Sequence, residues 1–274
     1  MRAFLFLIFI SITNFAVCQN HPLFVSTGAK SLSLANTSVS QEDVWANFNN
    51  QAGLARLEHK EFAVFFEDRY FNSGLNTIGF AAAMPTKSGT FGIGYKRFGV
   101  ADLFNQSNTS INYGRLLSEN FSIGAGISYL NTFIGNNYGQ SSSISAHLGF
   151  IAKLNESLFL SSHVSNLNRA KVAEFNDERY PTLLTVGLKY LVSEKVATML
   201  EVDKDMMHKP SYRGAVDYNI IENFFVRIGV ASNPTLFSFG VGYSKNAFTI
   251  DYGASLHQVL GLTNNISLSY ALGK

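Results

Sequence analysis

Residues 121–129 read FSIGAGISY, and this stretch decides the fold. Phe121, Ile123, Ala125, Ile127 and Tyr129 are apolar or aromatic, and serine or glycine stands between them. Because successive side chains of a β-strand point to opposite faces, the stretch has one apolar face and one small or polar face. A soluble sandwich uses this alternation too. Its repetition along a chain with a secretory leader, with aromatic residues near the strand ends, favours a closed barrel in an outer membrane.

The same alternation recurs outward from this stretch in both directions and predicts about fourteen strands, an even number of the kind that bacterial single-chain barrels have. The expected ranges are 62–70, 77–84, 90–98, 108–117, 121–133, 142–153, 158–166, 182–192, 196–203, 212–220, 224–231, 236–243, 248–256 and 265–272. Tight polar turns such as 118–120 alternate with longer connections such as 168–180. Short turns on one rim and longer loops on the other are typical of such barrels and predict that both termini are periplasmic.

The first residues have the layout of a secretory signal. A basic start at Arg2 precedes an apolar run over 4–12 and a small-residue exit near Ala16. We therefore predict a signal peptide over residues 1–18. Cys18 is the single cysteine, so simple cleavage and lipoprotein processing both remain open, and a disulfide within the chain is excluded.

Composition excludes several classes of protein. Over 274 residues the formal net charge is +2, and lysine and arginine are scattered, so we expect no nucleic-acid partner. After the leader, no apolar run approaches the roughly 20 residues that a spanning helix needs. The prediction of a membrane protein therefore depends on the strands alone.

Charged residues within the expected strands fall on the face opposite to the apolar one. A charge on the lipid face costs about 2 to 4 kcal/mol at the bilayer midplane, so these side chains are expected in the lumen. The opposite signs predict a paired network that braces the lumen, and a binding or transport site is the alternative. The expected members are Glu201, Asp203, Arg213, Asp217, Arg227 and Asp251.

The segment before the strands does not alternate. Residues 28–57 read GAKSLSLANTSVSQEDVWANFNNQAGLARL, with the string DVWANFNN at its centre. This segment resembles the PorV/PorQ family of Bacteroidetes outer-membrane proteins, relatives of the FadL long-chain fatty-acid transporters. The residues taken to form the family's hatch are Gly28, Asp43, Trp45, Phe48, Asn49, Asn50 and Gly53. Gln51 stands where the family usually has proline, and the chain ends without the usual aromatic residue.

The resemblance implies a 14-stranded transmembrane antiparallel β-barrel, an all-β fold, over residues 60–274. An N-terminal hatch over residues 19–59 folds back into its lumen. Small inward residues such as Gly92, Gly94 and Gly124 leave room for a plug, and a barrel of this size encloses a cavity that is either wet or filled. The alternative is a segment that only covers the periplasmic mouth.

Function is expected to be non-enzymatic. His147, His163 and His257 lie near serines, but no nucleophile motif accompanies them, and no histidine pair has ligand spacing. We therefore expect no catalytic residues, no metal site and no cofactor.

The family resemblance leaves two roles open. The first is an accessory or interaction subunit of the type IX protein secretion system, with a large translocon barrel or secreted cargo as partner. The alternative is FadL-like transport of small hydrophobic molecules across the outer membrane. In both cases the remaining partner is outer-membrane lipid.

Overall fold

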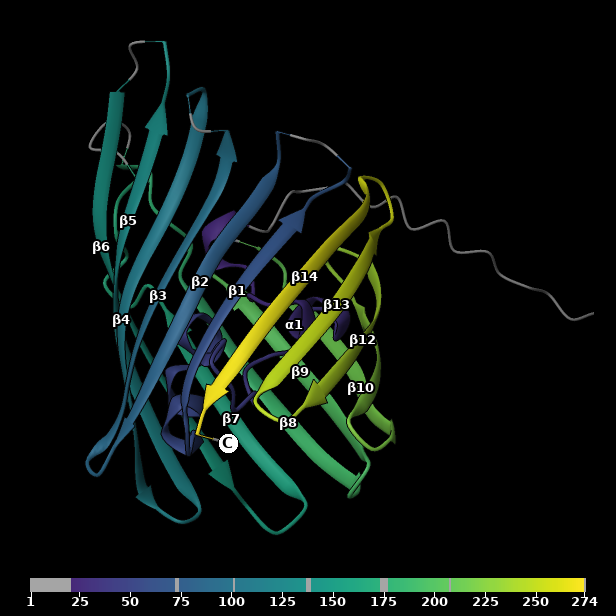
Figure 1. The fold of residues 1–274 in the computed structure, drawn as a ribbon. Helices are drawn as coiled ribbons and strands as arrows, with labels where there is room; N and C mark the ends of the chain where they lie inside the picture. The colour runs from purple at the N-terminus through teal and green to yellow at the C-terminus, as the bar shows by residue number, and fades with distance from the viewer. Residues whose placement is uncertain are drawn as a thin grey trace, which may run out of the picture.

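The computed structural model describes residues 21–273 except 72, 73, 101, 137, 138, 173–176 and 207. It is a closed antiparallel barrel of fourteen strands, as the alternation predicts, in which each strand pairs with its sequence neighbours and β1 pairs with β14 (Figure 1). The strands are β1 Lys60–Asp68, β2 Asn76–Thr86, β3 Gly89–Val100, β4 Phe104–Ser118, β5 Phe121–Ile134, β6 Gly139–Lys153, β7 Leu158–Ser165, β8 Leu183–Ser193, β9 Val196–Asp205, β10 Ser211–Ile221, β11 Phe224–Ala231, β12 Leu236–Lys245, β13 Phe248–His257 and β14 Gly261–Leu272. The signal peptide and Cys18 lie outside the described residues.

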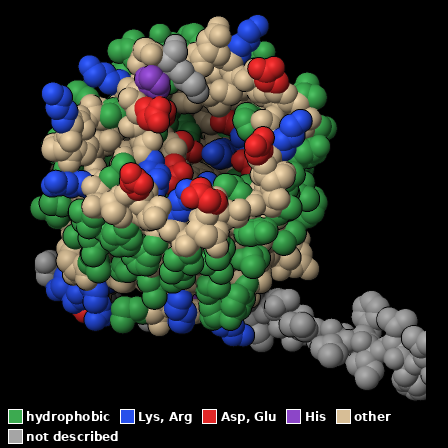
Figure 2. Space-filling view, turned by 90° about the horizontal axis from the view of Figure 1, so that it is seen from below, with side chains coloured by type: hydrophobic (Ala, Val, Ile, Leu, Met, Phe, Trp, Pro, Cys, Tyr) green, Lys and Arg blue, Asp and Glu red, His purple; other side chains and the backbone are tan. Residues whose placement is uncertain are grey.

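The pleat sorts side chains between lipid and lumen as the sequence predicts. On β12, Phe237 and Phe239 are 54% and 45% exposed on the outer surface, while Ser238 between them is completely buried. Figure 2 shows the resulting hydrophobic flank of the barrel below the charged rim. Together with the fold, this apolar outer surface marks an outer-membrane barrel.

Aromatic pairs lie near one end of the barrel. Phe91 packs on Tyr113 with ring centroids 4.9 Å apart, and Phe248 packs on Tyr270 at 4.7 Å. Both pairs lie beside tight turns at the lower end in Figure 1, where the chain also ends. We call this end the turn end and the opposite one the loop end. A ring of aromatic side chains at the membrane interface is typical of such barrels.

Most connections at the loop end are shorter than expected. β3 and β4 reach Val100 and Phe104, whereas the sequence predicted a loop over 99–107, and β14 begins at Gly261 rather than at residue 265. The pairing of β3 with β4 continues beyond the alternating part of the sequence because strands pair through backbone hydrogen bonds. Polar Asn105 therefore pairs with Gly99 as readily as an apolar residue would. The long connection over 166–182 is present and folds back on itself, with the amide of Asn166 donating to the carbonyl of Tyr180.

The N-terminal segment lies inside the barrel and does not merely cover its mouth (Figure 1). It contains short helical turns at η1 Pro22–Phe24, α1 Ala29–Ser33, α2 Ala46–Asn49 and η2 Gln51–Arg56. Glycines in the wall allow the close approach: a Cβ on Gly229 would lie 2.5 Å from the carbonyl carbon of Leu34, and one on Gly94 would lie 2.5 Å from the ring of Phe48. In the described part of the chain no helix is long and apolar enough to cross a membrane.

Candidate functional site: the hatch and the lumen chamber

Asn49 joins the two ends of the hatch. Its side-chain oxygen accepts the N–H of Thr27 at 2.8 Å, and its amide nitrogen donates to the Thr27 carbonyl at 3.1 Å and to the hydroxyl of Ser31 at 3.1 Å. An amide side chain carries both donors and an acceptor, so one asparagine satisfies both backbone groups of a distant residue. The hatch is therefore a folded unit held together by its own hydrogen bonds.

Asn50 and Gln51 attach this unit to the wall. Asn50 donates to the carbonyl of Val39 at 2.7 Å within the hatch and to that of Phe150 on β6 at 3.3 Å. The side-chain oxygen of Gln51 lies 3.0 Å from Nε2 of His163. Gln51 therefore contributes a polar contact to the wall.

Trp45 and Phe48 pack the hatch against β1 and β3. The indole of Trp45 meets the ring of Phe65 edge to face at 5.5 Å, and the ammonium of Lys96 lies 5.1 Å above the ring of Phe48. Gly28 has a φ of 99°, and a Cβ there would lie 2.9 Å from the indole. Glycine is required at this position both because its φ is positive and because a side chain would collide with the indole.

Asp43 and Gly53 have local roles. Asp43 accepts the N–H of Trp45 at 3.0 Å and lies 3.5 Å from the ammonium of Lys30. A Cβ on Gly53 would collide with the carbonyl of Gln41. The structure thus places all seven hatch residues from the sequence analysis within the lumen segment, where their contacts are with the hatch and the wall.

The six lumen charges form two clusters rather than one network. In the first, Arg213 binds Glu201 at 3.0 Å and also binds Asp203. Glu201 accepts the backbone N–H groups of Ser38 and Val39 at 2.8 and 2.9 Å. This carboxylate therefore fixes the hatch as well as the arginine.

In the second cluster, Arg227 lies between Asp217 at 3.1 Å and Asp251 at 2.6 Å. It borders a hollow of about 200 Å³ at the turn end, which Lys30 and Asp43 of the hatch also line. Figure 2 looks into this end and shows charged side chains of both signs around and within the hollow. The clusters are separate because Arg213 forms its ion pairs with Glu201 and Asp203 on β9. Asp217, four residues further along β10, forms its ion pair with Arg227 on β11.

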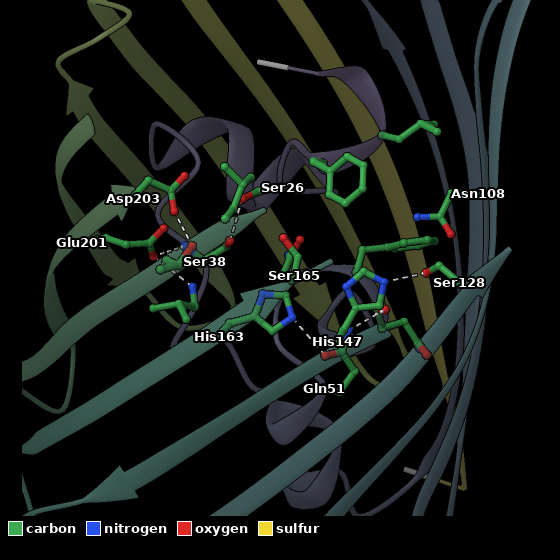
Figure 3. A pocket seen from close by; sticks show the side chains of 18 of the residues that line it. Ser26, Ser38, Gln51, Asn108, Ser128, His147, His163, Ser165, Glu201 and Asp203 are labelled. Carbon is green, nitrogen blue, oxygen red and sulfur yellow. Dashed lines mark hydrogen bonds between the residues drawn. The ribbon is translucent and has the colours of Figure 1, made fainter. Parts of the chain in front are cut away.

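A chamber remains in the lumen between η1 and the later part of the hatch around Asn49 and Gln51 (Figure 3). About 40 Å³ of it is open to the centre of a water-sized sphere, which is room for a few water molecules. The rings of His147 and His163 stack at 6.1 Å, and Nε2 of His147 lies 2.9 Å from the hydroxyl of Ser128. The polar lining includes Ser26, Ser38, Asn108, Ser128, His147, His163, Ser165, Thr185, Glu201 and Asp203.

An apolar cluster borders the chamber on the loop side. We call it the cap cluster; it consists of Leu23, Phe24, Leu130, Ala170, Val172 and Tyr180. The ring of His21 packs against Tyr180 at 5.1 Å, and its Nδ1 accepts the N–H of Leu23 at 3.3 Å. The folded connection over 166–182 and the N-terminal turn η1 thus meet above the chamber. The first described residues therefore lie at the loop end, whereas the sequence analysis expected both termini at the turn end.

Sequence reasoning identified the hatch string but not the residues that face it across the lumen. Lys96 on β3 points into the lumen, and its ammonium donates to the carbonyl of Val25 and to the hydroxyl of Thr27, both at 3.0 Å. On β4, Asn108, Ser110 and Asn112 are polar and point into the lumen. This row of polar residues at every second position was the signal in the sequence that could have indicated them. No group of three metal-binding side chains exists among the described residues.

Solved structures with the same fold include a hydrocarbon channel and a toluene transporter. The chain is similar to the CymD monoaromatic hydrocarbon channel, with 12% identity, a TM-score of 0.68, and coverage of 92% of this chain and 99% of that one. The Pseudomonas putida toluene transporter TodX is 11% identical, with a TM-score of 0.68 and coverage of 89% of this chain and 97% of that one. A Pseudomonas aeruginosa FadL homologue is 13% identical, with a TM-score of 0.65 and coverage of 89% of this chain and 98% of that one. The chain thus shares the barrel fold of these three proteins. No protein-family model matches the chain, and no curated protein sequence matches it.

Replacing Glu201 by glutamine should loosen the hatch locally. The variant loses the charge that binds Arg213 and two backbone N–H groups, and hydrogen bonds to charged groups contribute about 1.5 to 3 kcal/mol. Amide exchange at Ser38 and Val39 should become roughly ten- to hundredfold faster, with Glu119→Gln in an exposed turn as the matched control. Unchanged exchange at both amides would contradict this role.

Acid should weaken the docking of η1. Burial, together with the charges of Lys96 and Arg69, lowers the pKa of His21 from 6.5 to about 4. His21 therefore takes up its proton at a lower pH in the docked state than in the undocked state. The free energy that stabilises the docked state has its full value above pH 6.5. It decreases by up to about 3 kcal/mol as the pH drops towards 4.

Exchange of the Leu23 amide at pH 7 and pH 4, corrected for intrinsic rates, measures this loss. His21→Gln keeps a hydrogen-bond acceptor but does not titrate, so its docking should be insensitive to pH over this range. An equal pH dependence in variant and wild type would rule out His21 as the cause.

Proposed function

We propose that this protein is a non-enzymatic outer-membrane channel for small hydrophobic molecules, and that its hatch is the gate. The observation that carries the proposal is a FadL-type barrel whose lumen is closed by a folded hatch, with a small chamber beneath an apolar cap cluster. The two hydrocarbon channels with this fold support the hydrophobic substrate class.

The route follows from the order of these features. A molecule arriving at the loop end, which we assign to the outside, meets the cap cluster first, because Phe24 and Tyr180 lie above the chamber. It then reaches the chamber, whose floor is the hatch at Asn49 and Gln51. Passage to the turn end requires the hatch to shift, since it binds Glu201 on β9 and, nearly half-way round the barrel, Lys96 on β3.

Uptake measurements test the function and the gate separately. Cells that make the full chain should accumulate labelled toluene faster than cells without it. The gate is tested with the double variant Val39→Cys and Gly187→Cys, because a Cβ on Gly187 would lie 2.5 Å from a methyl group of Val39. A disulfide there ties the hatch to β8.

Oxidation of the double variant should reduce uptake to the level of cells without the protein, and reduction should restore it. The reduced form of the same variant is the control. Uptake that never exceeds the background, with the barrel folded in the membrane, would contradict the transport function. Undiminished uptake through the disulfide-bonded form would contradict only the gate.

A type IX secretion accessory is the second candidate, and the resemblance of residues 28–57 to PorV/PorQ supports it. The dense anchoring of the hatch also favours a fixed plug over a gate. Purification from native membranes in mild detergent distinguishes the roles. A large translocon barrel that co-purifies, combined with no toluene uptake, favours the accessory role.

A further inference from the structure

The outer surface of the barrel changes from apolar to polar along one row of directly paired residues near the loop end. We call it the boundary row; it crosses seven neighbouring strands, from β14 through β1 and β2 to β6, with one outward side chain from each. Its members, in this order, are Ile266, Phe66, Ile78, Arg97, Ser107, Asn131 and Ser142. The first three are apolar and exposed to lipid, so the change at Arg97 marks the outer edge of the lipid core.

The lengths of the strands agree with this position. β4, β5 and β6 have 15, 14 and 15 residues, whereas β11 and β13 have 8 and 10. Figure 1 shows β5 and β6 reaching further up at the loop end than β13 and β14. The boundary row therefore rises out of the lipid on its way to β6, and its polar part stands above the membrane.

Arg97 has no partner in the part of the chain that the structure describes. Its guanidinium forms neither an ion pair nor a hydrogen bond with a described residue, whereas Arg213 and Arg227 in the lumen each bind two carboxylates. A charge on the outer wall is tolerated only near the membrane interface. An arginine at that level is free to bind a phosphate, which its planar guanidinium contacts through two parallel N–H donors.

The polar part of the boundary row presents both donors and acceptors. Oγ of Ser142 accepts from the hydroxyl of Tyr129 at 2.8 Å and from the amide nitrogen of Asn131 at 2.9 Å. The hydroxyl proton of Ser142 and Oδ1 of Asn131 are therefore left for a partner outside the chain. Uncharged donors and acceptors held in this way suit the hydroxyl groups of a sugar.

The spacing of the strands gives the size of the ligand. Neighbouring strands lie about 4.8 Å apart, so the row from Arg97 to Ser142 spans about 14 Å over three strand spacings. This is the size of a disaccharide that carries a phosphate. A phosphate at the lipid boundary with sugar above it is the head group of a phosphorylated glycolipid, the kind of lipid that forms the outer leaflet of an outer membrane.

We propose that the boundary row from Arg97 to Ser142 binds the phosphorylated sugar head group of an outer-leaflet glycolipid. The phosphate binds Arg97, and the sugar binds Ser107, Asn131 and Ser142. This inference is independent of the transport function, because the row lies on the outer wall, whereas the hatch and the chamber lie in the lumen.

Lipid binding to the full chain in detergent tests the inference. Three probes are compared by native mass spectrometry: lipid A, which is a phosphorylated disaccharide lipid, the same lipid after enzymatic removal of its phosphates, and phosphatidylglycerol. Lipid A should bind roughly tenfold more tightly than either of the others, because each of those lacks one half of the head group. This comparison needs no variant.

Matched variants locate the site. Arg97→Gln should weaken lipid A binding roughly tenfold and leave binding of the dephosphorylated lipid unchanged. The control is Arg115→Gln, which removes an exposed outward arginine of β4 at the turn end and should change neither. Asn131→Leu should weaken binding of the dephosphorylated lipid and leave phosphatidylglycerol binding unchanged. Variants are compared only if they remain heat-modifiable, that is, if they run as a compact species in detergent unless boiled.

Three results would overturn the inference. The first is equal binding of the three lipids, and the second is an equal effect of Arg97→Gln and Arg115→Gln on lipid A binding. The third is a protein from native membranes that occupies this face in place of lipid A and is lost with Arg97→Gln. Each of them leaves toluene uptake, and with it the proposed function, untouched.

Discussion

Closure of the barrel between its first and last strands is the constraint on which the rest of the structure depends. In a bilayer, every backbone N–H and C=O that faces lipid must be paired within the protein, so a sheet with a free edge is not tolerated. β1 and β14 pair along nine residue pairs, from Lys60 with Leu272 to Asp68 with Asn264. A chain that meets this demand with fourteen strands necessarily surrounds a lumen.

The lumen determines the character of the hatch. Wall side chains alone do not fill a barrel of this size. Glycines such as Gly229 and Gly94 let the N-terminal segment approach the wall, and Glu201 and His163 hold it there. Between this segment and the cap cluster a small polar chamber remains, which lies on the proposed route.

The sequence was sufficient for the architecture because strand alternation is a local property. In residues 121–129 and in β12, the apolar side chains must face lipid, so these segments show which residues point outward without reference to the rest of the chain. Loop lengths were predicted poorly because polar residues such as Asn105 pair in a ladder through their backbones. The hatch string was recognisable from Asp43 to Asn50, but its partners were not.

Those partners lie too far along the chain for local patterns to indicate them. Glu201 contacts Ser38 from more than 160 residues away, and Gln51 contacts His163 across 112. The separation of the lumen charges into two clusters has the same cause, because it depends on the register of β9 to β13.

The account depends most directly on the hatch filling the lumen. The measurement that tests this is single-channel conductance in planar bilayers, with the full chain compared with a variant that lacks residues 21–57. The account predicts little conductance for the full chain and a large, steady, water-filled pore for the variant, with the barrel still heat-modifiable. A folded variant that conducts no better than the full chain would contradict it.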